Sequence, residues 1–287
     1  MYRTHRNTSK RPAILLLAAL FFVHVTAFGQ SSDSLAIVRK DWKMTPIKKG
    51  LVWKQGHFKN LFGSPQEINF VEIDLRKYRK RIHLAADSVR LKTITQFAQE
   101  NAALIAVNGG FFDMKHGGAW DYVKVDRNVI NVTKKTTDRA NAILLIDRKG
   151  VNIQPASSID YVQDKPPNTL LSGPLLLHGG TPAALSTNAF NDNRHPRSAI
   201  AVTADRKLIL IVVDGRNNLA AGMHLHELTN ILRWLGARDA MNLDGGGSST
   251  LYIKGATENS VVNHPSDNKR FDHEGLRPVA NIIYLED

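Results

Sequence analysis

The chain of 287 residues contains no cysteine. A disulfide framework, a zinc–thiolate site, an iron–sulfur cluster and a thiol nucleophile are therefore excluded, and so is a lipidated cysteine as a membrane tether. Any chemistry of this chain must use carboxylate, hydroxyl, amide, imidazole or cationic groups. With 43% hydrophobic and 22% charged residues, the composition is that of a globular protein.

Acidic residues are scarce: 26 stand against 38 basic ones, which gives a formal charge of +12. Four of these positive charges precede Gln30 with no acidic residue among them, so +8 remains beyond that point. In a cytosolic protein such an excess suggests nucleic acid. The basic residues at 48–81 gather mainly at residues 48–54 and 76–81, and we do not expect them to form a nucleic-acid platform. We predict no nucleic-acid partner. Anionic glycans, phosphate-bearing polymers or anionic lipid surfaces fit an exported protein better, and a solvated basic surface is the alternative.

Long apolar runs are lacking except at residues 13–25, near the start of the chain. Basic residues precede this run, at Arg3, Arg6, Lys10 and Arg11, and small residues follow it, at Ala27 and Gly29. This layout predicts a signal peptide over residues 1–29 and an exported protein, periplasmic or secreted. The alternative is an uncleaved anchor, but a full span needs about 20 apolar residues. We expect no stable transmembrane span after cleavage.

The apolar patterns predict an α+β fold with a mainly antiparallel or mixed sheet and a few packed helices. Strands are expected at residues 68–75, 103–107, 141–146, 151–153, 198–203, 208–213, 239–243, 250–253 and 279–285. Helices are expected at residues 93–101, with a Thr93/Gln96 capping box, and at residues 225–235, ended by Gly236. Residues 30–63 are interpreted as a lead-in segment with a short strand and loops, and residues 64–287 as the main domain.

One pattern occurs twice in the sequence. Residues 93–112 contain a helix, a strand and Asn-Gly-Gly, and residues 224–247 contain a helix, a strand and Asp-Gly-Gly-Gly. A predicted hairpin neighbours each unit. These similarities indicate two pseudo-repeated halves whose glycine turns converge on one cleft.

The densest signal for chemistry is the glycine turn that begins at Asp244. Three glycines between two strands cost chain entropy and are expected where the backbone approaches a ligand closely or where φ is positive. A carboxylate beside free N–H groups suits a site where charge develops on a substrate. We predict that Gly245, Gly246 and Ser248 bind substrate there. The alternative is a tight turn in which Asp244 only binds backbone. No Gly-Lys-Ser/Thr ending follows, so a nucleotide phosphate loop is excluded.

The turn at Asn108, Gly109 and Gly110 is the second signal. The Asn108 amide can donate and accept hydrogen bonds, which suits a sugar hydroxyl or a phosphate oxygen. Phe111 and Phe112 follow, as a stacking wall for a sugar or, for at least one of them, as core. We predict that these three residues line a sugar subsite.

A pair of charged or titratable residues flanks each end of the predicted hairpin of residues 198–213. His195 and Arg197 precede its first strand, and Asp214 and Arg216 follow its second. Guanidinium groups bind phosphate well, although exposed arginines are usually only solvated, and Asp214 alternatively serves turn chemistry.

A metal is not required by any motif. His224 and His226 are two residues apart on a predicted helix, so they point to different sides and are poor joint ligands. No His-Glu-x-x-His, EF-hand or Gly-x-Ser-x-Gly pattern occurs. No cofactor is therefore required, and a divalent cation such as calcium remains an open alternative.

At these motifs the sequence resembles the phosphodiester glycosidases. The matching stretches are NGGFFD at 108–113, SGPLLL at 172–177, HPRSAIAVT at 195–203, VDGR at 213–216, GMHLHEL at 222–228, NLDGGGSSTLYI at 242–253 and RPVANIIYL at 277–285. Their order and spacing agree with the family, and the match spans about residues 70–285. One departure is His224, where the family usually has the threonine that caps the following helix, so that helix end is expected to be less well fixed.

The resemblance implies hydrolysis of a sugar-1-phosphodiester, for example an N-acetylhexosamine linked through phosphate, at the C1–O bond. A free sugar and a phosphomonoester would be released. Because a phosphomonoester leaves readily, a carboxylate at an oxocarbenium-like centre is the main requirement. We assign Asp244 to that role with Asp214 as its partner, Arg197 and Arg216 to phosphate, and His195 to proton donation. The alternatives are a non-catalytic binder of anionic surface glycans and a metal-dependent phosphodiesterase that cuts the P–O bond.

Overall fold

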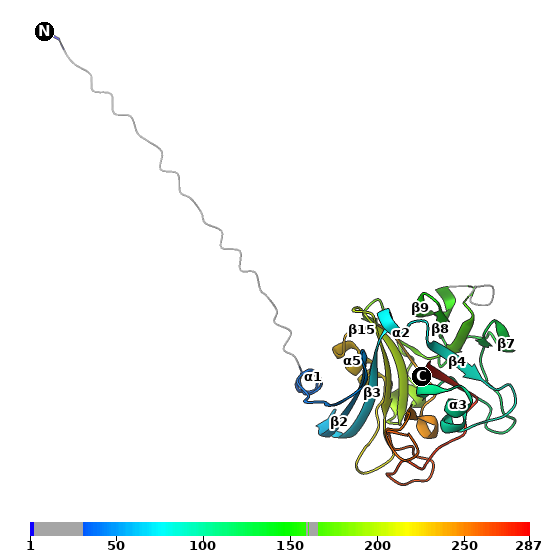
Figure 1. Cartoon of the computed structure of the whole chain (residues 1–287). Helices are drawn as coiled ribbons and strands as arrows, with labels where there is room; N and C mark the ends of the chain where they lie inside the picture. The colour runs from blue at the N-terminus through cyan, green and yellow to red at the C-terminus, as the bar shows by residue number, and fades with distance from the viewer. Residues whose placement is uncertain (3–30, 159, 161–165) are drawn as a thin grey trace. The chain divides into compact units, whose positions relative to one another are not determined.

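An eight-stranded antiparallel sheet is the largest element of the computed structural model, which describes residues 1–2, 31–158, 160 and 166–287. The predicted signal segment lies outside the described residues apart from Met1 and Tyr2. Ser31–Asp287 form one compact unit. The sheet order is β1-β2-β3-β14-β13-β15-β11-β12 (Figure 1). The strands are β1 (Lys43–Lys48), β2 (Leu51–Leu61), β3 (Ser64–Asp74), β11 (Leu175–His178), β12 (Thr181–Pro182), β13 (Arg197–Thr203), β14 (Lys207–Val213) and β15 (Ala237–Asn242).

Two smaller antiparallel sheets complete the strand content of the described residues. The five-stranded one has the order β7-β6-β10-β8-β9 and the four-stranded one the order β16-β5-β17-β4. Their bounds are β4 (Ile82–Ala86), β5 (Ala103–Asn108), β6 (Val123–Val125), β7 (Asn128–Asn131), β8 (Ala142–Asp147), β9 (Gly150–Pro155), β10 (Asn168–Ser172), β16 (Leu251–Ile253) and β17 (Asn281–Glu286).

The helices are short. They are α1 (Ser32–Val38), α2 (Leu75–Tyr78), α3 (Ile94–Glu100), α4 (Ala189–Asp192) and α5 (Leu225–Trp234), with 3₁₀ turns η1 (Ala156–Ser158) and η2 (Gly246–Ser248). No described helix has the length and apolar character that a membrane crossing requires.

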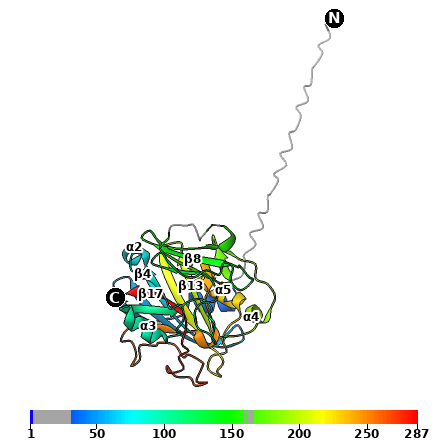
Figure 2. The same ribbon diagram turned by 90° about the vertical axis from the view of Figure 1, so that its right-hand side faces the viewer.

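Both faces of the large sheet are buried, and β14 shows why. Leu208, Leu210 and Val212 point into a core shared with the two smaller sheets. Ile209 and Ile211 point the other way, into a core covered by α1 and α5. Because side chains alternate along a strand, a sheet covered on both faces reads as a continuous apolar run. Figure 2 shows α5 and β13 lying near each other in the layered body.

The α+β prediction is confirmed by these sheets and helices. Residues 31–63 contain more regular structure than expected, because β1 and β2 extend the large sheet. The repeated pattern corresponds to α3–β5 and α5–β15, each with a capping box at its helix start. The two strands belong to different sheets, so the repeat covers these local units. At α5 the His224 ring accepts a hydrogen bond from the Glu227 N–H at 3.4 Å, which replaces the expected threonine cap.

The register of the β13–β14 hairpin shows which residues lie at each end of the large sheet. Arg197 pairs with Val213, and Ala199 pairs with Asn242 of β15, so the residues around Arg197, Asp214 and Asp244 share one end. The hairpin turn lies at the opposite end. Seven residues of strand at about 3.3 Å each separate the two ends by roughly 20 Å.

Candidate active site

The two glycine turns meet. The Asn108 side-chain N–H donates to the Asp244 carbonyl at 2.6 Å, and the Asp244 N–H donates to the Gly109 carbonyl at 2.9 Å. The second turn also meets the loop before β13, because the Gly246 N–H donates to the Pro196 carbonyl at 2.8 Å. The predicted convergence of glycine turns on one region is therefore observed.

Asn108 serves the framework of this region. Its side-chain oxygen accepts from the Ser198 hydroxyl at 2.6 Å and from the Thr250 N–H at 3.2 Å. Together with its bond to Asp244, these contacts join β5, β13 and the two ends of the glycine turn. Asn108 is 1% exposed, so the amide that was predicted to face a sugar holds protein strands instead.

Gly109 and Gly110 are also committed to protein contacts. The Gly109 N–H donates to the Asn281 carbonyl at 3.0 Å, and the Gly110 N–H donates to the Asn281 side-chain oxygen at 2.6 Å. A Cβ on Gly109 would lie 2.0 Å from that oxygen, so only glycine fits. The close approach that the glycines permit is to Asn281 of β17, whereas the sequence suggested a sugar.

The Asp244 carboxyl is the group at this junction that remains available. It is partly exposed and accepts a hydrogen bond from the Gly245 N–H at 3.0 Å. Burial raises the pKa of Asp244 to about 6, against the lowering effects of Ser248, the Gly245 N–H and the charges of Arg277 and Arg139. At neutral pH the carboxylate form predominates. The raised pKa shows that its negative charge is poorly solvated, as is common for reactive carboxyl groups.

The predicted substrate-binding residues of this turn differ in their surroundings. Gly245 and Gly246 are partly exposed, and Gly246 needs its glycine because φ is 62° and a Cβ would lie 3.0 Å from the Arg216 guanidinium. Ser248 is fully buried, and its hydroxyl interacts with the Asp244 carboxyl, whose pKa it lowers. Ser248 therefore acts on the candidate site through Asp244.

Arg197 lies beneath the turn at 1% exposure. Its Nε donates to the Met223 carbonyl at 2.8 Å, and its Nη2 donates to the Phe190 and Asn193 carbonyls at 2.7 and 2.9 Å. Its Nη1 has no partner within the described part of the chain. Burial lowers the pKa of Arg197 to about 10, helped by the charge of Arg216, so the guanidinium stays cationic. A buried cation with an unused donor suits an anionic ligand.

Arg216 and His195 belong to the same electrostatic group. Arg216 is exposed and adopts φ = 62°, a left-handed conformation that costs a non-glycine residue about 1 kcal/mol, and it holds the guanidinium beside Gly246. Burial, followed by the charges of Arg197 and Arg216, lowers the pKa of His195. The imidazole is therefore neutral at neutral pH, and the proton donation predicted for it requires acidic conditions.

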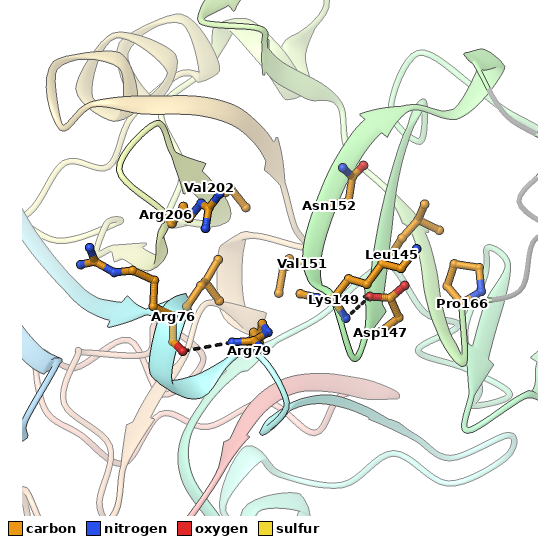
Figure 3. Close-up of a pocket in the computed structure, with 12 residues that line it drawn as sticks. Arg76, Arg79, Leu145, Asp147, Lys149, Val151, Asn152, Pro166, Val202 and Arg206 are labelled. Atoms are coloured by element: carbon orange, nitrogen blue, oxygen red, sulfur yellow. Dashed lines mark hydrogen bonds between the residues drawn. The ribbon is translucent and has the colours of Figure 1, made fainter.

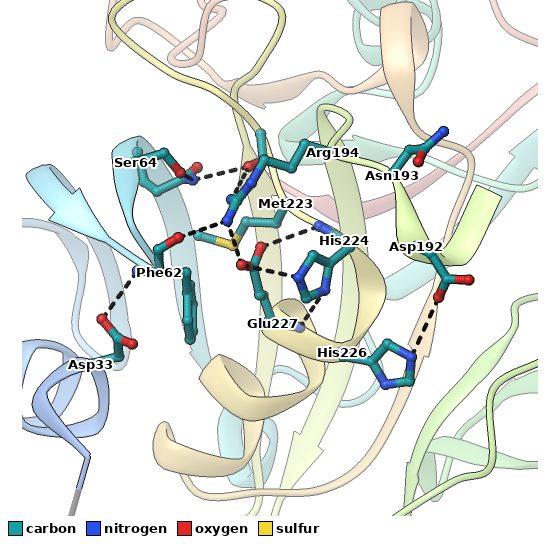
Figure 4. Close-up of polar contacts among 12 residues, drawn as sticks. Asp33, Phe62, Ser64, Asp192, Asn193, Arg194, Met223, His224, His226 and Glu227 are labelled. Atoms are coloured by element: carbon teal, nitrogen blue, oxygen red, sulfur yellow. Dashed lines mark hydrogen bonds and ion pairs between the residues drawn. The ribbon is translucent and has the colours of Figure 1, made fainter. Parts of the chain in front are cut away.

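An ion pair between partly exposed Arg194 and buried Glu227 fixes the loop that carries His195 and Arg197. The Arg194 guanidinium donates to Glu227 at 2.5 Å, to the Phe62 carbonyl at 2.8 Å and to the Gly222 carbonyl at 2.9 Å, as Figure 4 shows. Burial raises the pKa of Glu227 to about 7, and Arg194 opposes that shift. These contacts connect the β2–β3 turn, the loop before β13 and the start of α5, so Arg194 positions the site's basic groups.

Asp214, predicted as the second carboxylate, is held by another segment. One of its oxygens accepts from the Asn263 side chain at 2.9 Å and the His264 N–H at 3.0 Å, and the other lies 2.8 Å from His264 Nδ1. Asp214 is 1% exposed, and the His264 ring stacks on Phe271 at 3.8 Å between centroids. The geometry makes Asp214 the orienting partner of an imidazole. His264 was not predicted from the sequence, because an Asn-His-Pro loop carries no periodic or glycine signal.

Two arginines that act on Asp244, and a second carboxyl that shares one of them, were also not predicted. The charges of Arg277 and Arg139 both lower the pKa of Asp244. Arg139 stacks over Phe111 with 4.1 Å to the ring centroid, so Phe111 faces the site, while Phe112 packs in the core beside α3. The same arginine acts on Asp121, whose buried Oδ2 lacks a hydrogen-bond partner among the described residues and whose pKa is raised by burial. These residues lie in loops whose relation to Asp244 exists only in the folded chain.

Metal binding has little support from the side chains. Within the described ranges, no three histidine, aspartate or glutamate side chains lie together as ligands for a metal ion. The alternative of a bound calcium ion stays a prediction. The arrangement instead combines one desolvated carboxylate with guanidinium groups, which is suited to a substrate that carries both a reactive centre and a phosphate.

Comparison with known proteins agrees with this arrangement. Residues 101–286 match the family described as phosphodiester glycosidase. N-acetylglucosamine-1-phosphodiester alpha-N-acetylglucosaminidase from cattle is 30% identical over 201 residues, which cover 63% of this chain and 37% of that protein. The mouse protein of the same name is 29% identical over 196 residues, covering 62% and 37%. The chain thus spans little more than a third of the length of these relatives.

The fold is shared with solved structures. The catalytic domain of the zebrafish enzyme of that name, auto-inhibited by its pro-peptide, superposes with a TM-score of 0.66 at 19% identity, covering 85% of each chain. A hypothetical protein from Synechocystis superposes with a TM-score of 0.62 at 18% identity, covering 85% of this chain and 63% of that one. At these identities the likeness concerns the fold. From the matched residues 101–286, we conclude that the chain belongs to the phosphodiester glycosidases, a family of hydrolases.

Proposed function

We propose that the protein hydrolyses the C1–O bond of a sugar-1-phosphodiester at the Asp244 turn. Water supplies a hydroxyl to C1 and a proton to the departing phosphate oxygen, so a free sugar and a phosphomonoester are released. The observation that supports this proposal is the placement of the poorly solvated Asp244 carboxyl beside the Arg216 guanidinium, above buried Arg197.

The proposed roles of the residues follow from the charges that their side chains carry. The Asp244 carboxylate stabilises the positive charge that develops at C1 as the bond breaks. Arg216 and the unpaired Nη1 of Arg197 stabilise the negative charge on the leaving phosphate. Because that leaving group is already acidic, a strong proton donor is unnecessary, which agrees with the lowered pKa of His195.

The substrate class rests on chemistry and on the relatives. Their printed name describes removal of N-acetylglucosamine from a phosphodiester, and an N-acetylhexosamine-1-phosphodiester is accordingly our proposed substrate class. Export belongs to the same proposal, because it rests on the basic start and apolar run of residues 1–29. Fractionation of cells that produce the full chain tests it: we expect the protein outside the cytoplasm.

The activity is tested by incubating purified protein with the methyl phosphodiester of N-acetylhexosamine-1-phosphate. We expect a reducing sugar and methyl phosphate in equal amounts. The exposed Asp41, which forms no ion pair with any other described residue, provides a matched control. Asp244→Asn should lose turnover, and Asp41→Asn should retain it.

Other outcomes identify other functions. Binding without any product would favour a non-catalytic glycan binder and contradict the proposal. Release of methanol and sugar-1-phosphate, abolished by a chelator, would favour a metal-dependent phosphodiesterase.

A further inference from the structure

A basic groove lies far from the Asp244 turn. Its walls come from α2, the β8–β9 hairpin and the β13–β14 turn, and its volume is about 870 Å³ (Figure 3). The β13–β14 turn lies at the end of the large sheet opposite Arg197, roughly 20 Å along the strands. None of the residues assigned to the candidate active site lines this groove.

The groove carries an uncompensated positive charge. Arg76, Arg79, Lys149 and Arg206 line it, against the single carboxylate of Asp147. That carboxylate already accepts hydrogen bonds from the backbone N–H groups of Lys149 and Gly150 at 2.7 and 3.1 Å. Because Arg76 is itself paired with Asp74, three cations beside this one acid leave a net positive field for an anion.

Three of these cations have no acidic partner. Arg76 pairs with Asp74 at 2.9 Å, outside the groove lining. Arg79 donates to the backbone carbonyl of Arg76 at 3.1 Å and forms no ion pair within the described part of the chain. Among the described residues, neither Lys149 nor Arg206 lies within ion-pair distance of a carboxylate. Figure 3 shows their side chains drawn from separate elements around the same groove.

A second groove of about 590 Å³ adjoins the first, since both are lined by Asp147 and Lys149. It adds three further basic residues, Lys80, Arg127 and Arg148, and one more acid, Asp126. A ligand that fits both must carry several negative charges along an extended chain. Among the described lining residues of both grooves there is no phenylalanine, tyrosine or tryptophan that could stack on nucleic-acid bases.

We propose that these joined grooves bind an acidic carbohydrate chain, whose phosphate, sulfate or carboxylate groups are contacted by the unpaired guanidinium and ammonium groups. The proposal does not depend on the reaction at Asp244. A remote polyanion site would hold the protein at an anionic glycan surface while the other end of the sheet stays open.

The test uses a fluorescently labelled heparin oligosaccharide as a sulfated probe, inorganic polyphosphate as a phosphate probe, and dextran as an uncharged control. Binding is followed by fluorescence anisotropy for the labelled probe and by competition for the others, between low and physiological salt. We expect heparin and polyphosphate to bind and dextran not to bind. We also expect affinity to fall with salt, because bound cations are released from the probe.

A charge-matched pair of variants localises the effect. Arg79→Gln, Lys149→Gln and Arg206→Gln together should weaken heparin binding at least tenfold and make its salt dependence shallower. Arg39→Gln, Lys43→Gln and Lys59→Gln remove the same charge from exposed residues of α1, β1 and β2, and should change affinity less than twofold. Thermal unfolding checks that both variants are folded.

Three results would overturn the proposal: no binding of either polyanion by the wild-type protein at physiological salt, equal losses in the two variants, or tighter binding of a single-stranded DNA oligonucleotide of equal charge. The last would mean that a nucleic acid is the preferred occupant. Relative affinities for heparin and polyphosphate distinguish sulfated from phosphorylated chains.

Discussion

The two glycine turns are similar in sequence and local structure, yet their polar groups are used differently. At Asn108–Gly109–Gly110 the side-chain oxygen and both glycine N–H groups bind neighbouring strands. At the Asp244 turn, Asp244 is partly exposed, burial raises the pKa of its carboxyl, and guanidinium groups lie nearby. The first turn is a framework, and the second is the candidate site. Glycines alone do not distinguish them; the satisfaction of the surrounding polar atoms does.

The largest expected effect concerns the open turn. Asp244→Asn keeps the shape of the side chain and removes its charge, so we expect kcat to fall by about 10²- to 10⁴-fold. Thermal unfolding should show no loss of stability. Steady-state kinetics on the sugar-1-phosphodiester measure the change, with Asp41→Asn as control. Near-normal turnover would remove Asp244 from the mechanism and end the distinction between the turns.

The framework turn should respond in stability instead. Asn108→Ala removes hydrogen bonds to Asp244, Ser198 and Thr250 in a buried setting, for an expected loss of about 3 kcal/mol in the free energy of unfolding. Urea unfolding measures it, and Asn60→Ala on exposed β2 should change stability by less than about 0.5 kcal/mol. A stable Asn108→Ala protein without activity would instead mean that the amide contacts substrate.

Substitution of Arg216 is expected to affect phosphate binding without affecting the stability of the fold. The exposed guanidinium makes no ion pair among the described residues, so Arg216→Gln should raise KM about tenfold with little change in thermal stability. Arg238→Gln, at an exposed position of β15, is the control. An unchanged KM would show that the substrate phosphate lies elsewhere.

The smallest effect is a pH dependence of stability at the same carboxyl. Because the folded pKa of Asp244 is about 6 and its ordinary value is 3.8, the folded chain binds more protons between these pH values. Stability is therefore full below about pH 4 and falls as pH rises through about 6. Asp244→Asn should be more stable than wild type at pH 8, by about 1 kcal/mol after discounting for the exposed part of the group, and equal to it near pH 4. Chemical denaturation of both proteins at the two pH values measures this difference in stability. If the difference between variant and wild type were the same at pH 4 and pH 8, the carboxyl would be well solvated.

How far the sequence predicts this molecule depends on whether a signal is local. The β13–β14 hairpin follows from two continuous apolar runs, α5 follows from its periodic apolar residues, and the capping boxes of α3 and α5 follow from short motifs. In contrast, β1 has a lysine at each end and mostly exposed side chains, so it offers no apolar period, and it pairs with β2 at the edge of the sheet.

Prediction of the candidate site was likewise limited to residues with a local sequence signal. Asp244 and its glycines were found because their pattern is local. Arg139, Asp121 and His264 belong to separate loops that reach the carboxylates only through folding. Conversely, Asn108 looked like a ligand group, and it was the positions of β13 and β16 that assigned its hydrogen bonds to the protein.

The claim that the Asp244 site breaks the bond at the sugar carbon is tested most directly by hydrolysis in ¹⁸O-labelled water. Attack at C1 and attack at phosphorus on the sugar side release the same two molecules from the methyl phosphodiester, so only the position of the label separates them. We expect ¹⁸O in the sugar and none in methyl phosphate when the products are measured by mass spectrometry. Label in methyl phosphate would contradict it.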